Sequence, residues 1–97
     1  VIRHRNWRKG HLELDIIAAK NDELIVVEVK TRSDADIMQP EEAVDRQKIK
    51  HTVRAADTYI RFFQIDVPVR FDIVTVVGKP GNFKIEHIKE AFYPPIF

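Results

Sequence analysis

Two acidic residues and one lysine have the types and spacing to do chemistry together. Asp15 closes the segment Glu13-Leu14-Asp15, and Glu28 is followed two positions later by Lys30. Carboxylate oxygens are the ligands that Mg²⁺ and Mn²⁺ prefer, and an ammonium beside such a metal can position water and neutralise phosphate charge. If Asp15, Glu28 and Lys30 meet, they outline a site for metal-assisted phosphodiester hydrolysis, with Glu13 in support.

Two expected strands must bring these side chains together. Residues 12–18 alternate with period two, which predicts a strand, and residues 24–31 are rich in Val and Ile. Asn21 and Asp22 between them are a turn-forming pair. The alternation predicts two faces of the first strand: Leu12, Leu14 and Ile16 on one, and Glu13, Asp15 and Ile17 on the other.

The turn decides which residues face each other across this hairpin. With Asn21 and Asp22 as the two turn residues, Asp15 faces Glu28, and Glu13 faces Lys30 by the same register. Facing residues share one side of the sheet, with Cβ atoms roughly 4.5–5.5 Å apart. A three-residue loop would put the partners on opposite sides.

The acids and the lysine also allow a plainer interpretation. Facing acidic and basic residues on a solvated sheet often form only cross-strand ion pairs. Glu28 and Lys30, however, follow a strand whose apolar start indicates cover on both faces, where charges are costly unless they are used. Both interpretations stay open at this point.

The remaining pattern predicts one α/β domain over residues 1–97. We expect a basic edge strand over 2–7, a loop over 33–40, and a long helix that begins between Pro40 and Asp45 and ends near Phe63. Strands are expected over 67–77 and 83–87, a turn over 78–82, and one helical turn over 88–92. The predicted helix carries an apolar stripe of residues spaced four and three apart: Ile49, Val53, Ala56, Ile60 and Phe63. This order predicts a mixed sheet with a helix on one face.

Basic residues gather in two places although the formal net charge is only +1. Arg5 and Arg8 lie near the start, and Arg46, Lys50 and Arg54 recur on one helix face. Such groups are candidates for contacts with nucleic-acid phosphates, and a solvated charged surface is the alternative. Trp7 could stack on an unpaired base, but packing against the protein is the more common role of a lone Trp.

Composition excludes several classes of protein. The absence of cysteine excludes disulfides, thiolate metal sites and a cysteine nucleophile. The longest apolar runs are too short to cross a bilayer, so no membrane association is expected. No signal-peptide pattern opens the sequence, and we expect a cytoplasmic protein. The three glycines are isolated and form no phosphate-binding loop.

These residues together resemble a known family. Asp15, followed by Glu28-Val29-Lys30 at a strand end, is similar to the PD-(D/E)XK core of restriction-endonuclease-like nucleases. The resemblance extends over nearly the whole chain to the YraN-like family of bacterial proteins regarded as endonucleases, a group similar to Holliday-junction resolvases. The segments that carry it are Arg5-Asn6-Trp7-Arg8, Glu13-Leu14-Asp15-Ile16-Ile17-Ala18, Val27-Glu28-Val29-Lys30-Thr31-Arg32, Glu42-Ala43-Val44-Asp45 and Arg70-Phe71-Asp72.

The resemblance implies a restriction-endonuclease-like three-layer α/β core with a central mixed sheet. It implies that Asp15 and Glu28 hold Mg²⁺ or Mn²⁺, with Lys30 beside them, and that branched or structured DNA is the substrate class. The family usually has a helix before the first strand, and we expect no such helix within these residues. A two-fold junction substrate would suit a homodimer.

Two functions from different classes are therefore expected. The first is a metal-dependent endonuclease in which Asp15, Glu28, Lys30 and Glu13 act on DNA. The second is a non-catalytic nucleic-acid-binding module that keeps the nuclease fold in relict form. An interaction domain without any role in nucleic-acid binding remains a third alternative.

Overall fold

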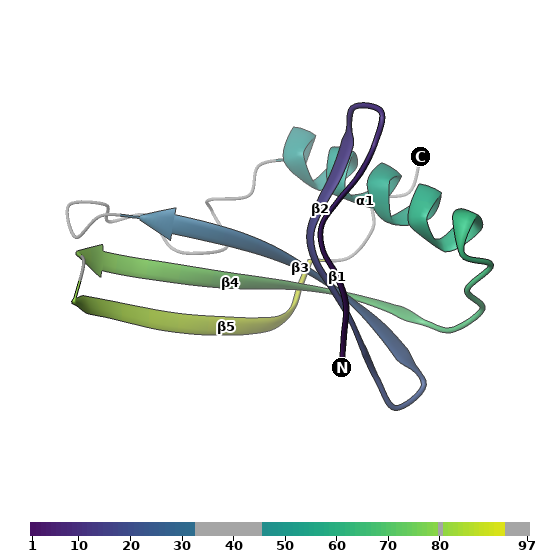
Figure 1. Cartoon of the computed structure of the whole chain (residues 1–97). Coiled ribbons are helices and arrows are strands. Elements are labelled where there is room, and N and C mark those ends of the chain that lie inside the picture. The colour runs from purple at the N-terminus through teal and green to yellow at the C-terminus, as the bar shows by residue number, and fades with distance from the viewer. Residues whose placement is uncertain (33–45, 80, 93–97) are drawn as a thin grey trace.

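The computed structural model describes residues 1–32, 46–79 and 81–92. Within them the chain forms one five-stranded sheet and one helix (Figure 1). The elements follow the chain in this order: β1 (Ile2–Lys9), β2 (Leu12–Lys20), β3 (Glu23–Arg32), α1 (Arg46–Phe62), β4 (Val69–Lys79) and β5 (Asn82–Phe92). The expected loop over 33–40 and the expected start of the helix lie outside the described residues.

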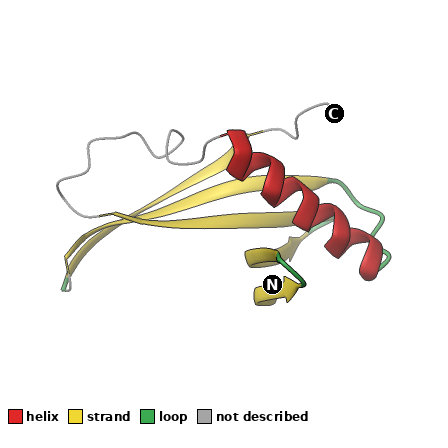
Figure 2. Ribbon diagram, turned by 90° about the horizontal axis from the view of Figure 1, so that it is seen from above, coloured by secondary structure: helices red, strands yellow, loops and turns green. Residues whose placement is uncertain are grey.

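The sheet is mixed, and its strands lie side by side in chain order. β1, β2 and β3 pair antiparallel, β3 and β4 pair parallel, and β4 and β5 pair antiparallel. The parallel pair needs a crossover connection, and α1 lies in that connection. Figure 2 shows α1 against one face of the sheet. The predicted mixed α/β fold with a helix on one face is confirmed, and β1 is an edge strand as expected.

The β2–β3 hairpin has the predicted register. Its ladder runs from Lys20 facing Glu23 to Ile16 facing Val27, which leaves Asn21 and Asp22 as the turn. Asn21 adopts a left-handed backbone with φ 55°, a conformation that Asn tolerates better than most residues. The next facing position after Ile16 and Val27 is that of Asp15 and Glu28.

The predicted faces of β2 are wrong beyond Asp15. Leu14 and Ile17 are both fully buried in the same core cluster, although strict alternation would put them on opposite faces. Asn6, in the neighbouring strand, has φ 51°, which interrupts the regular pleat there. From Ile16 to Lys20, β2 pairs with β3. Before Asp15, the β1–β2 hairpin rises steeply away from β3 (Figure 1). The sheet therefore forks at Asp15.

The core lies between α1 and the sheet. Its buried cluster consists of residues from α1 and three strands: Leu14, Ile17, Leu24, Val26, Ala55, Ala56, Tyr59 and Phe71. Ala55 and Ala56 let the helix approach the sheet closely, while the completely buried Tyr59 bonds His4 Nδ1 through its hydroxyl at 2.7 Å. Of the predicted stripe, Ala56 belongs to this core and Val53, Ile60 and Phe63 pack against it, whereas the stripe omitted the fully buried Tyr59. Trp7 contacts Tyr59 edge-on, so packing is its role here.

The helix ends where the sequence predicted. Gln64 has φ 53°, the N–H of Gln64 donates to the carbonyl of Arg61, and the N–H of Ile65 donates to the carbonyl of Ile60. This is the bonding pattern of a Schellman cap, which satisfies the last carbonyls of a helix.

The predicted helical turn over 88–92 is wrong, because these residues belong to β5. The pairing of β4 with β5 shifts between Phe71–Phe92 and Ile73–Ile88, so that three residues of β5 bulge opposite Asp72. Glu90 in this bulge has φ 50° and donates its N–H to Asp72 Oδ1 at 3.0 Å. A buried carboxylate thus anchors a strand bulge where local sequence suggested a turn. The expected turn over 78–82 is also shorter, since both strands enter it.

Candidate active site at the fork of the sheet

Asp15 lies where β2 parts from β3. Its Oδ2 accepts a hydrogen bond of 2.9 Å from the backbone N–H of Val29. This position is just beyond the last residues that the β2–β3 ladder pairs. This hydrogen bond holds the Asp15 carboxylate against β3, the strand that carries Glu28 and Lys30, at the point where the two strands part.

Glu28 lies beside it on β3 and is buried, with only 5% of its surface exposed. Two ammonium groups reach the same oxygen, Oε1. Lys48 Nζ from α1 lies 3.1 Å away, and Lys30 Nζ from β3 lies 3.9 Å away. A buried carboxylate without compensating charge would be costly, and these two lysines supply that compensation.

Two members of the site, Glu28 and Lys48, have shifted pKa values. Burial raises the pKa of Glu28 above its ordinary value, and the nearby charge of Asp15 raises it further, against the opposing effects of Lys48 and Lys30. Burial lowers the pKa of Lys48, but the charge and hydrogen bond of Glu28 outweigh this, and the net pKa is raised. Perturbed pKa values of titratable groups cluster at functional sites.

Glu13 has a different partner from the one expected. It faces Arg8 across the β1–β2 pair, and its Oε2 lies 3.3 Å from the Arg8 guanidinium. The β2–β3 ladder ends before it could bring Glu13 opposite Lys30. Glu13 still lies near enough to Lys48 to raise the pKa of that ammonium slightly. It therefore belongs to the outer edge of the site.

The chemistry of the donors fits a divalent cation held by few protein ligands. Asp15 and Glu28 offer the carboxylate oxygens that Mg²⁺ and Mn²⁺ favour, and Mg²⁺ is usually bound by one or two carboxylates together with water and substrate phosphates. No cluster of three or more His, Asp or Glu side chains suited to a metal occurs in residues 1–32, 46–79 and 81–92. An ion held by Asp15 and Glu28 alone would take its other ligands from water and substrate.

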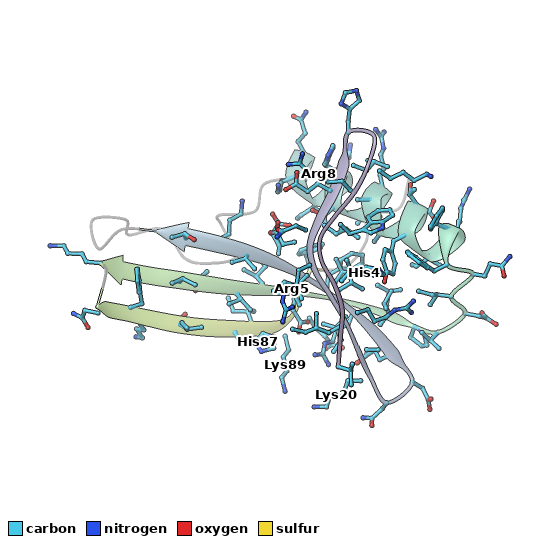
Figure 3. The ribbon with its side chains drawn as sticks, in the orientation of Figure 1. His4, Arg5, Arg8, Lys20, His87 and Lys89 are labelled. Atoms are coloured by element: carbon cyan, nitrogen blue, oxygen red, sulfur yellow. The ribbon has the colours of Figure 1, made fainter. Side chains whose placement is uncertain are left out.

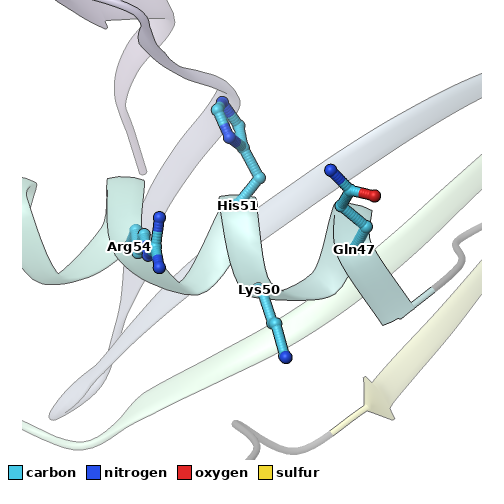
Figure 4. A pocket seen from close by; sticks show the side chains of 4 residues that line it. All are labelled: Gln47, Lys50, His51 and Arg54. Carbon is cyan, nitrogen blue, oxygen red and sulfur yellow. The ribbon is translucent and has the colours of Figure 1, made fainter. Parts of the chain in front are cut away.

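The predicted basic helix face forms a shallow hollow on α1. Gln47, Lys50, His51 and Arg54 line it, and we call these four residues the α1 hollow (Figure 4). All four are exposed, so Lys50 and Arg54 are accessible to a phosphate backbone. Arg46 begins α1, but its side chain lies outside the described part of the chain.

The two expected arginines of β1 lie in separate places. Arg8 is near the tip of the β1–β2 hairpin, and Arg5 lies on the same strand but farther from that tip (Figure 3). Arg5 is exposed and lines a second hollow together with Asn6, Asp15, Ile16 and Val29. Of the two, Arg5 is therefore the one placed beside a site carboxylate.

Asp72 is part of a separate network. It is completely buried, bonds the Arg70 guanidinium through both oxygens at 2.9 and 3.0 Å, and lies 2.7 Å from His87 Nε2. Arg70 also reaches Glu23 at 3.1 Å. Burial would raise the pKa of Asp72, but its bonds to Arg70, His87 and the N–H of Glu90 hold that pKa below its ordinary value.

Lys48 is the site residue that sequence reasoning missed. It is one of the basic residues of α1, but its side chain pairs with Glu28 and does not line the α1 hollow. A signal was present, because Lys48 lies four and seven residues before the buried Thr52 and Ala55 and so flanks the buried side of α1.

Comparison with known proteins places the chain in a family. The family model described as "Uncharacterised protein family UPF0102" matches residues 1–76. A UPF0102 protein of Bacteroides fragilis is 76% identical over 97 residues, covering all of this chain and 80% of the relative. A UPF0102 protein of Flavobacterium johnsoniae is 43% identical over 96 residues, covering 95% of this chain and 78% of the relative.

None of the helices in the described ranges is long and apolar enough to span a membrane. A five-stranded mixed sheet with one helix carries the paired carboxylates at its fork. The family match covers most of the chain, and alignments with relatives in the genus Bacteroides cover 100% of this chain. The chain belongs to the UPF0102 family.

Proposed function

We propose that this chain is a metal-dependent endonuclease that hydrolyses phosphodiester bonds, with branched or structured DNA as its substrate class. One observation carries the proposal: Asp15 and Glu28 come together at the fork of the sheet, with Lys30 and Lys48 at the oxygen of Glu28. The resemblance to YraN-like and resolvase-like nucleases of the PD-(D/E)XK group supports it.

Each residue has a role that follows from its place. Asp15 and Glu28 would hold Mg²⁺ or Mn²⁺, which supplies Lewis-acid stabilisation of phosphate charge when bound. Lys30, next to Glu28 on the same face of β3, would orient the attacking water and offset developing negative charge. Glu13, at the edge of the site, would keep its cationic neighbours in place.

The surroundings can bind the nucleic-acid backbone. Arg5 lies beside Asp15, and Arg8 lies on the hairpin above it. Lys50 and Arg54 of the α1 hollow add two exposed charges on a rigid helix. We assign these four residues, with Arg46, to phosphate contacts, which position a nucleic acid without reading its sequence.

A cleavage screen tests the proposal. Labelled four-way junctions, flaps, duplexes and single strands are incubated with the chain and Mg²⁺ or Mn²⁺. We expect metal-dependent cleavage that Lys30→Ala and Asp15→Asn abolish, while Asp57→Asn, a change at an exposed carboxylate paired with Arg61 on α1, leaves it unchanged. Cleavage that persists in both site variants would refute the assignment of the site.

A non-catalytic nucleic-acid-binding module is the second candidate, and a specific observation favours it. No group of three or more His, Asp or Glu side chains suited to a metal occurs among the described residues, while the α1 hollow is basic by itself. Such a module would bind DNA without metal, and its binding would survive Asp15→Asn.

Sedimentation with and without a junction would also show whether the chain acts as a homodimer.

A further inference from the structure

Glu28 forms ion pairs with two lysines that come from different elements. Lys30 lies on the same strand, and its side chain is 26% exposed, whereas Lys48 comes from α1, and its side chain is 43% exposed. Lys48 is also the nearer, at 3.1 Å against 3.9 Å. The tighter contact is therefore made by the side chain with more access to solvent.

Two ammonium groups already lie against the carboxylates of the site. Lys30 and Lys48 both form ion pairs with Oε1 of Glu28, and the charges of Asp15 and Glu13 also act on Lys48. A divalent cation entering this set would lie within a few ångströms of two ammonium groups and would be repelled by both. Binding of the cation therefore becomes more favourable if one ammonium leaves or if new negative charge arrives.

Lys48 is the ammonium that can leave. Its long stem rotates about several bonds, and 43% of its side chain is exposed, so its ammonium is accessible to a phosphate that approaches α1 from solvent. Gln47 and Lys50, on either side of it in α1, line the α1 hollow, so a backbone bound there would pass close to Lys48. A phosphodiester at this place would bring the negative charge that a released ammonium can contact.

We propose that Lys48 is an internal counter-cation, which holds Glu28 in the metal-free protein and passes to nucleic-acid phosphate when a divalent cation binds. The inference rests on the proposed function, because it assumes that Asp15 and Glu28 form a metal site. It makes metal affinity depend on bound nucleic acid. By reciprocity, nucleic-acid affinity then depends on metal by the same factor.

Calorimetric titration with Mn²⁺ in the absence of nucleic acid tests whether Lys48 opposes metal binding in the free protein. Lys48→Gln and Lys48→Met both remove the charge, and the second keeps most of the stem. We expect each to bind Mn²⁺ about tenfold more tightly than the unchanged chain, since a cation close to the metal is gone. Lys50→Gln makes the same charge change on α1 without touching Glu28, and its Mn²⁺ affinity should stay within about twofold.

The same titration with a short phosphorothioate duplex present tests the coupling. The duplex should raise the Mn²⁺ affinity of the unchanged chain several-fold, and that of the two Lys48 variants by clearly less. Thermal unfolding without metal establishes that each variant is folded before it is titrated.

The outcomes separate this inference from the proposed function. Equal Mn²⁺ affinity, or weaker affinity in folded Lys48 variants, would overturn the counter-cation role and leave the metal site standing. A lack of Mn²⁺ binding by the unchanged chain and by both Lys48 variants would overturn the metal site, and with it both proposals.

Discussion

The backbone N–H of Val29 donates a hydrogen bond of 2.9 Å to Oδ2 of Asp15. Val29 stands between Glu28 and Lys30, so this bond joins one half of the candidate site to the other across the fork of the sheet. The strands separate here, and a side-chain oxygen satisfies a backbone donor at their parting. The position of Asp15 is thus fixed by the strand that carries its partners.

Asp15→Asn should abolish metal binding and leave the fold intact. The amide oxygen of Asn can still accept the hydrogen bond of Val29, while the negative charge that a cation needs is lost. We expect Mn²⁺ affinity to fall at least about tenfold and stability to change by less than about 1 kcal/mol. Calorimetry and thermal unfolding measure the two effects, and Asp57→Asn serves as control. Unchanged Mn²⁺ affinity would remove Asp15 from the site.

Glu28→Gln should stabilise the protein at neutral pH while weakening metal binding. The folded state raises the pKa of Glu28 above its ordinary 4.5, so the ionised form costs stability at every pH above the raised value. As pH falls from the raised pKa toward 4.5, this cost is relieved in the native protein, and the advantage of the variant should shrink. Active sites commonly trade stability for function in this way.

Thermal unfolding of both proteins across neutral and acidic pH checks this prediction. Glu86→Gln is the matched control, because Glu86 is half exposed on β5 and pairs only with Lys84 among the described contacts. A variant less stable than the unchanged chain at neutral pH would mean that the bonds from Lys48 and Lys30 outweigh the burial of Glu28.

Lys50→Ala and Arg54→Ala should weaken binding to all DNA sequences alike. If each side chain neutralises one phosphate, each change should reduce the slope of log affinity against log salt by about 1. Anisotropy titrations of labelled DNA over a range of salt concentrations measure that slope. Lys84→Ala, a change at an exposed lysine of β5, should leave it unchanged. If the salt slopes of all three variants equal that of the unchanged chain, the α1 hollow is not part of the interface.

Asp72→Asn should destabilise the protein without affecting metal binding. The carboxylate is completely buried and bonds Arg70, His87 and the N–H of Glu90, so loss of its charge breaks a satisfied network. We expect a loss of about 2–3 kcal/mol at neutral pH.

The pH dependence of Asp72→Asn follows from a lowered pKa. Because folding depresses the pKa of Asp72, its contribution is fully present above the ordinary 3.8 and is lost as pH falls through the depressed value. The difference between the two proteins in denaturant unfolding should therefore persist from neutral pH down to about 4 and diminish only below it. A difference that vanishes at neutral pH would show that Asp72 does not anchor the bulge of β5.

Much of this arrangement can be predicted from sequence because it is local. Asn21 and Asp22 fix a two-residue turn, and the turn fixes the register that points Asp15 toward Glu28. The period of the apolar residues in 49–63 likewise predicts α1 and the side that it buries, since helix geometry repeats along the chain. The proposed metal and substrate stay predictions that the experiments above must test.

The tertiary structure decided what depends on contacts between distant segments. Periodicity cannot show that β2 leaves β3 at Asp15, or that Leu14 and Ile17, on either side of it, both join the core that includes α1. Nor can it show that Lys48 reaches Glu28, or that Asp72 draws Glu90 into a bulge. The sequence by itself determined which groups could do chemistry and which strands carry them. Only packing between strand and helix determined which charge lies against which, since that energy exists only after the segments meet.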